Sequence, residues 1–491
     1  MRSLVFLFST IFFISCSVSK NYNPNIKYSS ETLREDYNFL RNVLEKKHPS
    51  LYWYTPKDTM DYYFDAGYKE ISDSMTELKF GWKILAPLTS AIHCGHTSFS
   101  MSKGWNKFIK NKKIPSFPLY MKIWSDTMVV VNNLNKEDSV IKRGTIITSV
   151  NGIKSGDLIS RMFDFMVEDG YSDNVNYIRL SASFPYFHRN IFGLYKNYII
   201  GYIDSTGIEK SKTISYYSPP EDSLGKGRRN VPGLKPKKSS KKERLRNIRS
   251  LQIDTSAAVM TINTFSKAKL HHFFKSSFRK LRRNKITNLV VDIRANGGGD
   301  INNYVLLTKY LRRTPFRVAD TAYAVSKNFG PYTRQISSGF FNNIGLWFVT
   351  HKEKDERYHF RYWERHTFTP KRKNHFDGQV YVLTNGLTFS ASSLFCNAVK
   401  GQQNISLVGE ETGGGWYGNS GIMIPDITLP KTKLRVRLPF FRLVQYNHVP
   451  QKGTGVIPDV FIGPNVKDII TQEDTKMEYV KKVIAESAPP K

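Results

Sequence analysis

The sequence predicts an α/β fold for its C-terminal half, residues 251–485. Short runs of Val, Ile and Leu, typical of buried strands, alternate there with longer segments whose apolar residues recur at helical spacing. Repeated strand–helix units favour a mainly parallel sheet with helices on its faces. The expected strands are 257–262, 289–293, 380–383 and 406–409, and the expected helices are 271–283, 301–311 and 390–399. An aromatic- and arginine-rich insertion, 315–377, interrupts the pattern and is expected to form a hairpin or lid, or an inserted lobe.

Two further regions precede this core, because 491 residues are too many for one compact domain. Residues 30–112 read as a helical lobe, with expected helices at 31–46, 59–72 and 78–92 and Ser30 as the first cap. Residues 114–217 change to strand runs and turns, and Asn151-Gly152 is a hairpin-turn signal.

The most informative stretch runs from Gly378 to Gly415. A strand is followed by the turn TNGLTFS and by a helix start rich in small residues. A serine at such a junction exposes its hydroxyl, and the next backbone N–H groups are unpaired at the helix N-terminus. Ser390 is therefore a candidate nucleophile beside part of an oxyanion hole. The same residue would also serve as an ordinary helix cap.

A glycine-rich turn follows the strand 289–293. Gly297, Gly298 and Gly299 free the backbone to point its N–H groups outward, which suits an anion. A phosphate-binding loop would fit as well, but no Lys-Ser/Thr pair follows the glycines. A plain tight turn is the other interpretation.

Together these segments resemble the S41 family of serine peptidases, which includes tail-specific and C-terminal processing proteases. The resemblance is carried by four ordered motifs: DIRANGGG at 292–299, TFSAS at 388–392, GEETGG at 409–414 and GVIPD at 455–459. It implies a ClpP/crotonase-like α/β catalytic core and an acyl-enzyme on Ser390. The oxyanion donors it implies are the backbone N–H groups of Gly297 or Gly298 and of Ala391.

The expected base depends on the branch of the family. Processing proteases use a lysine at the position of Gly415, so a Ser-Lys dyad is missing here. The tricorn-like branch takes a histidine from the N-terminal helical region, and the run AIHCGHTS makes His96 the expected base. That branch also has a glutamate just before GVIPD, where this chain has Gln451-Lys452-Gly453-Thr454 and no acid, so the residue that orients His96 stays unassigned. The alternative function is a non-catalytic relative that holds a hydrophobic ligand or peptide.

Residues 141–162, IKRGTIITSVNGIKSGDLISRM, resemble the core of a PDZ-like module, a fold that captures extended peptides at a sheet edge. Apart from Cys16 the chain has only Cys94 and Cys396, which are most simply two small buried residues. His93, Cys94 and His96 are not joined by a second cluster with zinc-type spacing, so neither a metal nor a cofactor is expected.

The N-terminus predicts export and lipidation. Residues 1–15 combine Arg2 with an apolar run too short to span a bilayer, as in a signal peptide. The ending Ile-Ser-Cys resembles a bacterial lipobox, with Cys16 as the lipidated mature terminus and 16–29 as a tether. An uncleaved anchor is the alternative. The expected location is the cell envelope, periplasm-facing or at the outer membrane, with proteins or peptides as substrates.

Residues 218–250 read as a basic, flexible linker. The segment 225–249 holds eleven Lys or Arg against one Glu, about a third of the net charge of +32. Such a run can contact anionic lipid or acidic substrates, or can simply be a solvated loop. Nucleic acid is not expected as a partner, because the chain shows no nucleic-acid-binding module and is predicted to be exported.

Overall fold

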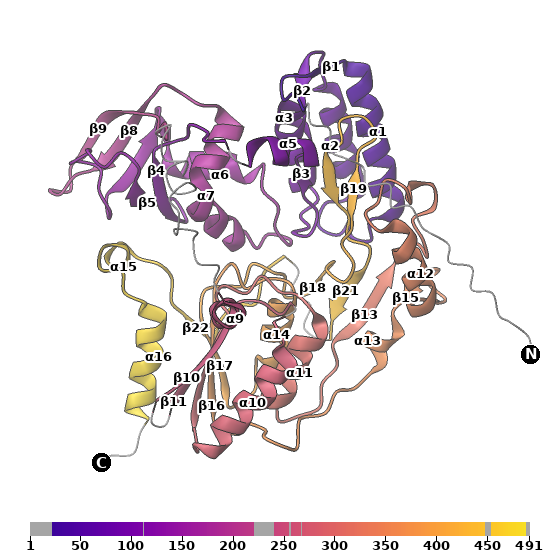
Figure 1. Ribbon diagram of the computed structural model, residues 1–491, viewed down its shortest axis with the longest axis vertical. Coiled ribbons are helices and arrows are strands. Elements are labelled where there is room, and N and C mark those ends of the chain that lie inside the picture. Colours follow the sequence, from indigo (N-terminus) through magenta and orange to yellow (C-terminus); the bar gives the residue numbers. More distant parts are fainter. Residues whose placement is uncertain are drawn as a thin grey trace, which may run out of the picture.

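A computed structural model describes residues 22–110, 112–219, 240–254, 257–266, 268–446 and 453–487 (Figure 1). The predicted signal peptide, Cys16 and residues 220–239 of the predicted linker lie outside these ranges. No helix within them is both long and apolar enough to cross a bilayer.

The C-terminal half is built on a six-stranded sheet in the order β10-β11-β12-β16-β17-β22. Neighbouring strands from β11 to β22 are parallel, and β10 is antiparallel to β11. This confirms the repeated strand–helix units expected from the sequence. The strands are β10 (Arg249–Asp254), β11 (Ala257–Ile262), β12 (Asn288–Asp292), β16 (Gln379–Thr384), β17 (Ile405–Gly409) and β22 (Val460–Phe461).

Helices cover both faces of this sheet, because successive strand side chains point to opposite sides. Val291 and Val382 pack on one face, beneath the helices α10 (Leu270–Arg283), α11 (Ile301–Leu311) and α14 (Ala391–Val399). Val290 and Leu383 pack on the other face, against α16 (Thr475–Glu486), which follows the short helix α15 (Val466–Thr471) (Figure 1). The parallel strands β12 and β16 therefore end at the same edge, where the glycine turn and Ser390 follow them.

The N-terminal lobe is helical, as expected. The helices are α1 (Ser30–Lys47), α2 (Lys57–Lys69) and a rod made of α3 (Glu77–Phe80), the π-helical turn η1 (Gly81–Leu85) and α4 (Ala86–Ser90). Ser29, and not Ser30, caps α1 through a hydrogen bond from Thr32 N. The rod ends at Ser90, before the expected 92, because His93 adopts a left-handed conformation with φ of +52°. The strands β1 (Lys27–Tyr28) and β2 (Met75–Thr76) pair beside these helices.

The N-terminal lobe also takes in residues from the C-terminal half. The strands β19 (Asp426–Thr428) and β20 (Arg435–Arg437) form a sheet with β3 (Phe99–Ser100), which the helix α5 (Lys103–Ile109) follows. Ile427, Leu434 and Val436 are buried in the same core as the residues of α1. The expected boundary at 251–485 is therefore wrong for this segment.

Residues 114–217 carry a core of their own under an antiparallel sheet in the order β4-β5-β6-β8-β9, with β7 paired to β6. The strands are β4 (Leu119–Trp124), β5 (Thr127–Asn133), β6 (Ile146–Val150), β7 (Ile153–Lys154), β8 (Asn197–Ile203) and β9 (Glu209–Ser215). Asn151 and Gly152 both have positive φ in the turn between β6 and β7, which confirms the expected hairpin. The likeness to PDZ domains stays a prediction. Two helices, α6 (Ser155–Phe163) and α7 (Asn174–Phe192), are joined by a loop that leaves this sheet.

The insertion 315–377 contains the expected hairpin, formed by β14 (His351–Lys352) and β15 (Tyr358–His359). It is part of a larger sheet in the order β14-β15-β13-β21-β18, whose last two strands come from outside the insertion. The other elements are β13 (Ala319–Ala324), η3 (Gly330–Tyr332), α12 (Gly339–Val349), α13 (Arg361–Arg365), β18 (Gly418–Asn419) and β21 (Arg442–Gln445).

The part of the predicted linker that the structure describes, from residue 240, forms regular secondary structure. Residues Lys241–Ile248 form the helix α9, which runs directly into β10. Ser240 and Glu243 make a capping box, in which each side chain bonds the other residue's backbone N–H. The expectation of a flexible linker reaching residue 250 is therefore wrong from residue 240 onward.

Candidate active site

Ser390 lies at the junction between the turn after β16 and the first residue of α14. Its backbone has φ of +54° and ψ of −123°, a conformation that residues with a Cβ rarely adopt. This sharp turn projects the half-buried side chain away from the helix that it precedes. Its Oγ lies 3.1 Å from Nε2 of His96.

The loop that follows the neighbouring parallel strand, β12, holds this turn. Phe389 N donates to Asn296 O at 3.2 Å, and the Thr388 hydroxyl donates to Ile293 O at 3.2 Å. The fit is tight, because a Cβ on Gly298 would lie only 2.7 Å from the Ser390 Cβ. Gly298 also has φ of +100°, so no other residue fits here without strain. Gly298 thus allows one loop to lie directly against the other.

His96 comes from the N-terminal lobe, in the turn that follows α4. Its side chain is 5% exposed, and its ring lies against the Phe389 ring with centroids 5.0 Å apart. Because Nε2 faces a hydroxyl that can donate to it, the proton of the neutral ring belongs on Nδ1. Among the described residues Nδ1 has no hydrogen-bond partner, and Asp169 Oδ1 lies 3.8 Å from it.

Asp169 is the carboxylate that the sequence analysis missed. It lies in the loop between α6 and α7, and its side chain is 4% exposed. Gly95 N donates to its Oδ1 at 2.8 Å and Gly415 N to its Oδ2 at 3.4 Å. The position at which processing proteases carry their lysine thus contributes a backbone donor to this aspartate.

The Asp169 loop also contacts the segment in which a glutamate was expected. Tyr171 N donates to Gly453 O at 2.8 Å, and a Cβ on Gly170 would lie 2.7 Å from the Gly453 Cα. The carboxylate at 169 therefore lies in a loop next to the segment in which the tricorn-like branch carries its glutamate. The only sequence signal was an acidic pair before a glycine, Glu168-Asp169-Gly170, and nothing in the sequence tied that pair to His96.

Two of the three backbone N–H groups implied by the family resemblance have no acceptor among the described residues. Ala391 N opens α14, and neither it nor Gly297 N has a hydrogen-bond acceptor among the residues that the structure describes. Gly298 N, in contrast, donates to the Asn296 side chain at 3.0 Å. Of the two glycine donors implied by the family resemblance, Gly297 is therefore the one with an unengaged N–H.

Gly421 closes the site on another side. A Cβ at this position would lie 2.8 Å from His96 Nε2 and 3.0 Å from Ser390 Oγ. Gly421 N is held by the Asn419 side chain at 2.9 Å, and Asn419 ends the strand β18. The sheet that carries the insertion thus positions one wall of the site.

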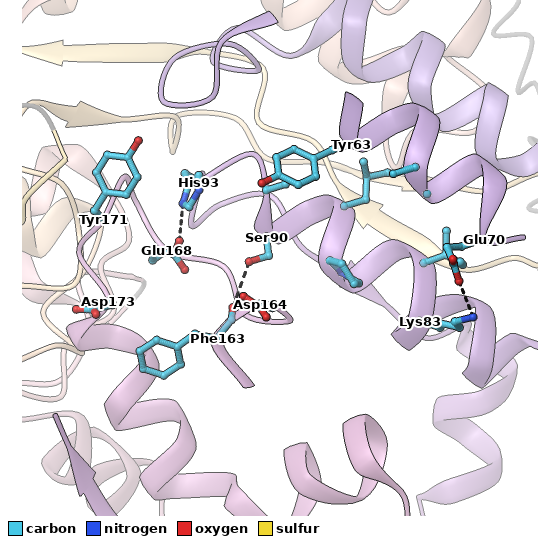
Figure 2. A pocket seen from close by; sticks show the side chains of 16 residues that line it. Tyr63, Glu70, Lys83, Ser90, His93, Phe163, Asp164, Glu168, Tyr171 and Asp173 are labelled. Carbon is cyan, nitrogen blue, oxygen red and sulfur yellow. Dashed lines mark hydrogen bonds and ion pairs between the residues drawn. The ribbon is translucent and has the colours of Figure 1, made fainter. Parts of the chain in front are cut away.

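A cavity of about 490 Å³ lies behind the histidine turn, between α2, α4 and the Asp169 loop (Figure 2). Its wall includes His93, whose Nδ1 bonds Glu168 at 2.7 Å, while the other oxygen of Glu168 accepts from Asn176 at 2.7 Å. Tyr63 and Tyr171 also line it. Glu168 therefore fixes the loop next to Asp169 from the side away from Ser390.

The other residues singled out in the sequence have structural contacts. Arg294 forms a two-pronged ion pair with Asp292, at 2.7 and 3.0 Å, and a second one with Asp474. Cys94 and Cys396 are buried free thiols, and burial raises the pKa of Cys94 to about 11. This confirms that both are small buried residues.

Part of the chain is similar in sequence to a known protein family. Residues 256–462 match the sequence profile of peptidase family S41. A comparison with curated proteins gives no match. Mature CPAF superposes with a TM-score of 0.62 at 14% identity, covering 92% of this chain and 96% of that one. Mature CPAF complexed with lactacystin gives the same score and identity and covers 92% and 97%.

A putative peptidase from Parabacteroides merdae covers 93% of this chain and 99% of its own, at 13% identity and a TM-score of 0.46. At these identities the CPAF structures show a shared fold, and the sequence profile shows a similarity to the family over residues 256–462. The profile spans both loops that meet at Ser390 and the five parallel strands from β11 to β22. The α/β core of this chain, residues 256–462, is therefore similar to peptidase family S41.

Proposed function

We propose that the chain is a serine peptidase of the Ser-His type, with Ser390 as nucleophile, His96 as general base and Asp169 as the residue that orients His96. The observation that carries the proposal is the 3.1 Å separation between Ser390 Oγ and His96 Nε2. These side chains come from two separate parts of the chain, and a hydroxyl within hydrogen-bond reach of an imidazole is the arrangement that activates serine.

In the first half of the reaction, Ser390 Oγ attacks the carbonyl carbon of a peptide bond while its proton passes to His96 Nε2. The carbonyl oxygen becomes an anion, which we expect the N–H groups of Ala391 and Gly297 to stabilise. Loss of one such donor typically costs about 3–4 kcal/mol of barrier. The imidazolium then gives its proton to the leaving amine, and an ester on Ser390 remains.

In the second half, water attacks the ester and its proton passes to His96 Nε2. Collapse of the second tetrahedral intermediate breaks the bond to Ser390 Oγ, which recovers a proton from His96. The carboxylate of Asp169 stabilises the positive ring in both halves from the Nδ1 side, and a contraction of the 3.8 Å separation would make a direct hydrogen bond. The predicted signal peptide and lipidation of Cys16 make exported proteins or peptides the proposed substrates.

A fluorophosphonate probe tests the nucleophile. We expect the wild-type chain to be labelled once, and Ser390→Ala to lose both the label and at least about 10³-fold of its casein-hydrolysing activity. Ser392→Ala is the matched control, because Ser392 lies two residues further on and is fully buried. Labelling that persists in Ser390→Ala would refute the assignment. An unreactive wild-type chain that co-purifies with an apolar ligand would favour a binding protein of the same fold.

A further inference from the structure

The helix α12 exposes its apolar face and turns polar side chains towards the protein, which is the opposite of an ordinary surface helix. The side chains that it exposes are large and apolar: Phe340 at 66%, Phe341 at 74%, Ile344 at 45%, Trp347 at 61% and Phe348 at 68%. Their spacing puts them on one face. The polar residues of the helix bond to the protein instead, since Asn343 accepts from Phe329 N and Asn342 donates to Ser337 O.

The helix α12 also has a side that is buried against the protein. Leu346 is fully buried in the core of the N-terminal lobe and fixes α12 to the protein. The exposed side chains point away from that anchor, and scattered single apolar residues, which are normal on a surface, do not produce such a continuous face. Figure 1 shows α12 at the periphery, on the same side of the molecule as the N-terminal lobe.

The charged residues within the sequence segment that contains α12, residues 321–352, are of one sign, although Lys352 at its end pairs with Glu356. No acidic residue occurs in the sequence between Asp320 and Glu353, whereas Lys327, Arg334 and Lys352 do. The Lys327 ammonium lies 5.5 Å from the centre of the Trp347 ring, at the edge of the aromatic face. An apolar face of Phe and Trp bordered by basic groups is typical of helices that lie in the interface of an anionic bilayer.

The beginning of the described chain supports the same partner. Tyr22 donates to Glu77 and lines one cavity together with Arg334 and Ser337, the segment that leads into α12 at Gly339. Cys16, the predicted lipid attachment point, precedes Tyr22 by six residues, which extend over at most about 20 Å. A lipid on Cys16 would therefore hold the side of the molecule that carries α12 close to the membrane.

We propose that the exposed aromatic face of α12 docks onto an anionic lipid bilayer, with its apolar side chains in the interface. The orientation of the peptidase on the membrane would then be set by two points, the lipid at Cys16 and the helix. The proposal does not depend on the catalytic assignment, because none of its residues touches Ser390 or His96.

A dye placed on the helix tests this directly. In the full chain with Cys16→Ser, an environment-sensitive thiol dye is attached at Phe341→Cys or, as a control, at Ile208→Cys. The strands β8 and β9 lie on the other side of the molecule from α12 in Figure 1, and Ile208, in the turn between them, is 58% exposed. The remaining thiols, Cys94 and Cys396, are buried. We expect vesicles of phosphatidylglycerol and phosphatidylethanolamine to shift the emission to the blue at 341 and not at 208.

A second variant separates the helix from the rest of the chain. In the Phe341→Cys background, Trp347→Glu should raise the lipid concentration needed for half of the blue shift at least about tenfold. The reason is that an aromatic side chain that enters the lipid is replaced by a charge. Hydrolysis of a soluble substrate should not change. Dye at 341 that stays in water while the chain floats with the vesicles would overturn the proposal. So would a blue shift without lipid that grows with protein concentration, since a second copy would then cover the helix.

Discussion

At the scale of single residues, the backbone of Ser390 is strained, and its proposed role as nucleophile explains why the strain is kept. A residue with a Cβ at φ of +54° and ψ of −123° is destabilised by about 1–3 kcal/mol, and the turn must be held by its neighbours. We expect Ser390→Gly and Ser390→Ala to be equally inactive, because both lack the nucleophile. Ser390→Gly should nevertheless be more stable by about 1 kcal/mol in urea unfolding, because glycine accepts this conformation without strain. Equal stability of the two variants would show that the turn relaxes.

Asp169 offers a second test at the same scale. Asp169→Asn keeps an oxygen that can accept from Gly95 N, so the loop should remain folded, but it removes the charge that stabilises the His96 imidazolium. We expect kcat to fall about 10²- to 10⁴-fold with little change in KM. Asp169→Glu should recover part of the loss, which a purely structural role would not allow.

The matched control for Asp169 is its neighbour. Glu168→Gln removes a buried charge from the same loop, beside His93 and Asn176, but not from the side that faces His96. If Glu168→Gln lowers kcat as much as Asp169→Asn does, the loop as a whole matters and the orienting role assigned to Asp169 is wrong.

Gly421 tests how closely the two catalytic side chains must fit. Because an added Cβ would press on both His96 Nε2 and Ser390 Oγ, Gly421→Ala should lower kcat about 10²-fold without unfolding the protein. Gly345→Ala is the control, since a Cβ there meets nothing within 4 Å. Wild-type activity in Gly421→Ala, measured with the same soluble peptide, would mean that the wall formed by residues 419–421 gives way easily.

At the scale of secondary-structure elements, His48 connects the end of α1 to the turn that carries His96. Ser50 N donates to its Nδ1 at 3.1 Å, so the ring proton is on Nε2, which donates to the Thr97 hydroxyl at 2.7 Å. Both ring nitrogens are thus used in the neutral form, and burial lowers the pKa of His48 from 6.5 to about 3.

This contact should make stability depend on pH. The folded pKa lies below the unfolded value, so the unfolded chain takes up a proton first, and stability is lost as pH falls from about 6.5 towards 3. In that window the free energy of unfolding should fall by up to about 1.4 kcal/mol per pH unit from this residue alone. The difference between wild type and His48→Gln in urea unfolding should therefore shrink between pH 7 and pH 5. A constant difference would mean that the pKa of His48 is not lowered in the folded protein.

The order of the core elements could be predicted from the sequence, because each strand and helix there has a local pattern and a short connection. The positions of Ser390 and of the glycine turn at one sheet edge follow from that order. Asp169 could not be predicted in the same way, since its partner is brought to it by packing between distant loops. The docking of β20 onto β3 was missed for the same reason, because three-residue strands have no periodicity of their own.

At the scale of the whole molecule, the site exists only where separate parts of the chain meet. His96 belongs to the N-terminal lobe, Ser390 to the α/β core and Asp169 to the loop between α6 and α7. One of the contacts that join the first two is the segment of the C-terminal half that folds into the N-terminal lobe. Asp36, fully buried on α1, is central to this contact, since it accepts from Lys431 N at 2.8 Å and from both Thr432 N and the Thr432 hydroxyl at 2.7 Å.

Removal of this carboxylate should therefore separate activity from folding. Asp36→Ala leaves the buried N–H of Thr432 and the half-buried N–H of Lys431 without an acceptor, which should lower the free energy of unfolding by about 1–3 kcal/mol. Glu35→Ala is the matched control, because Glu35 pairs with the Lys431 side chain in an exposed contact at 2.8 Å, typically worth less than about 1 kcal/mol. In a urea series, hydrolysis by Asp36→Ala should disappear at a lower concentration than the far-UV signal does, because the lobe that carries His96 loosens before the central sheet unfolds. If activity and far-UV signal are lost together in Asp36→Ala, the two parts unfold as one unit, and the meeting of His96 with Ser390 does not depend on this contact.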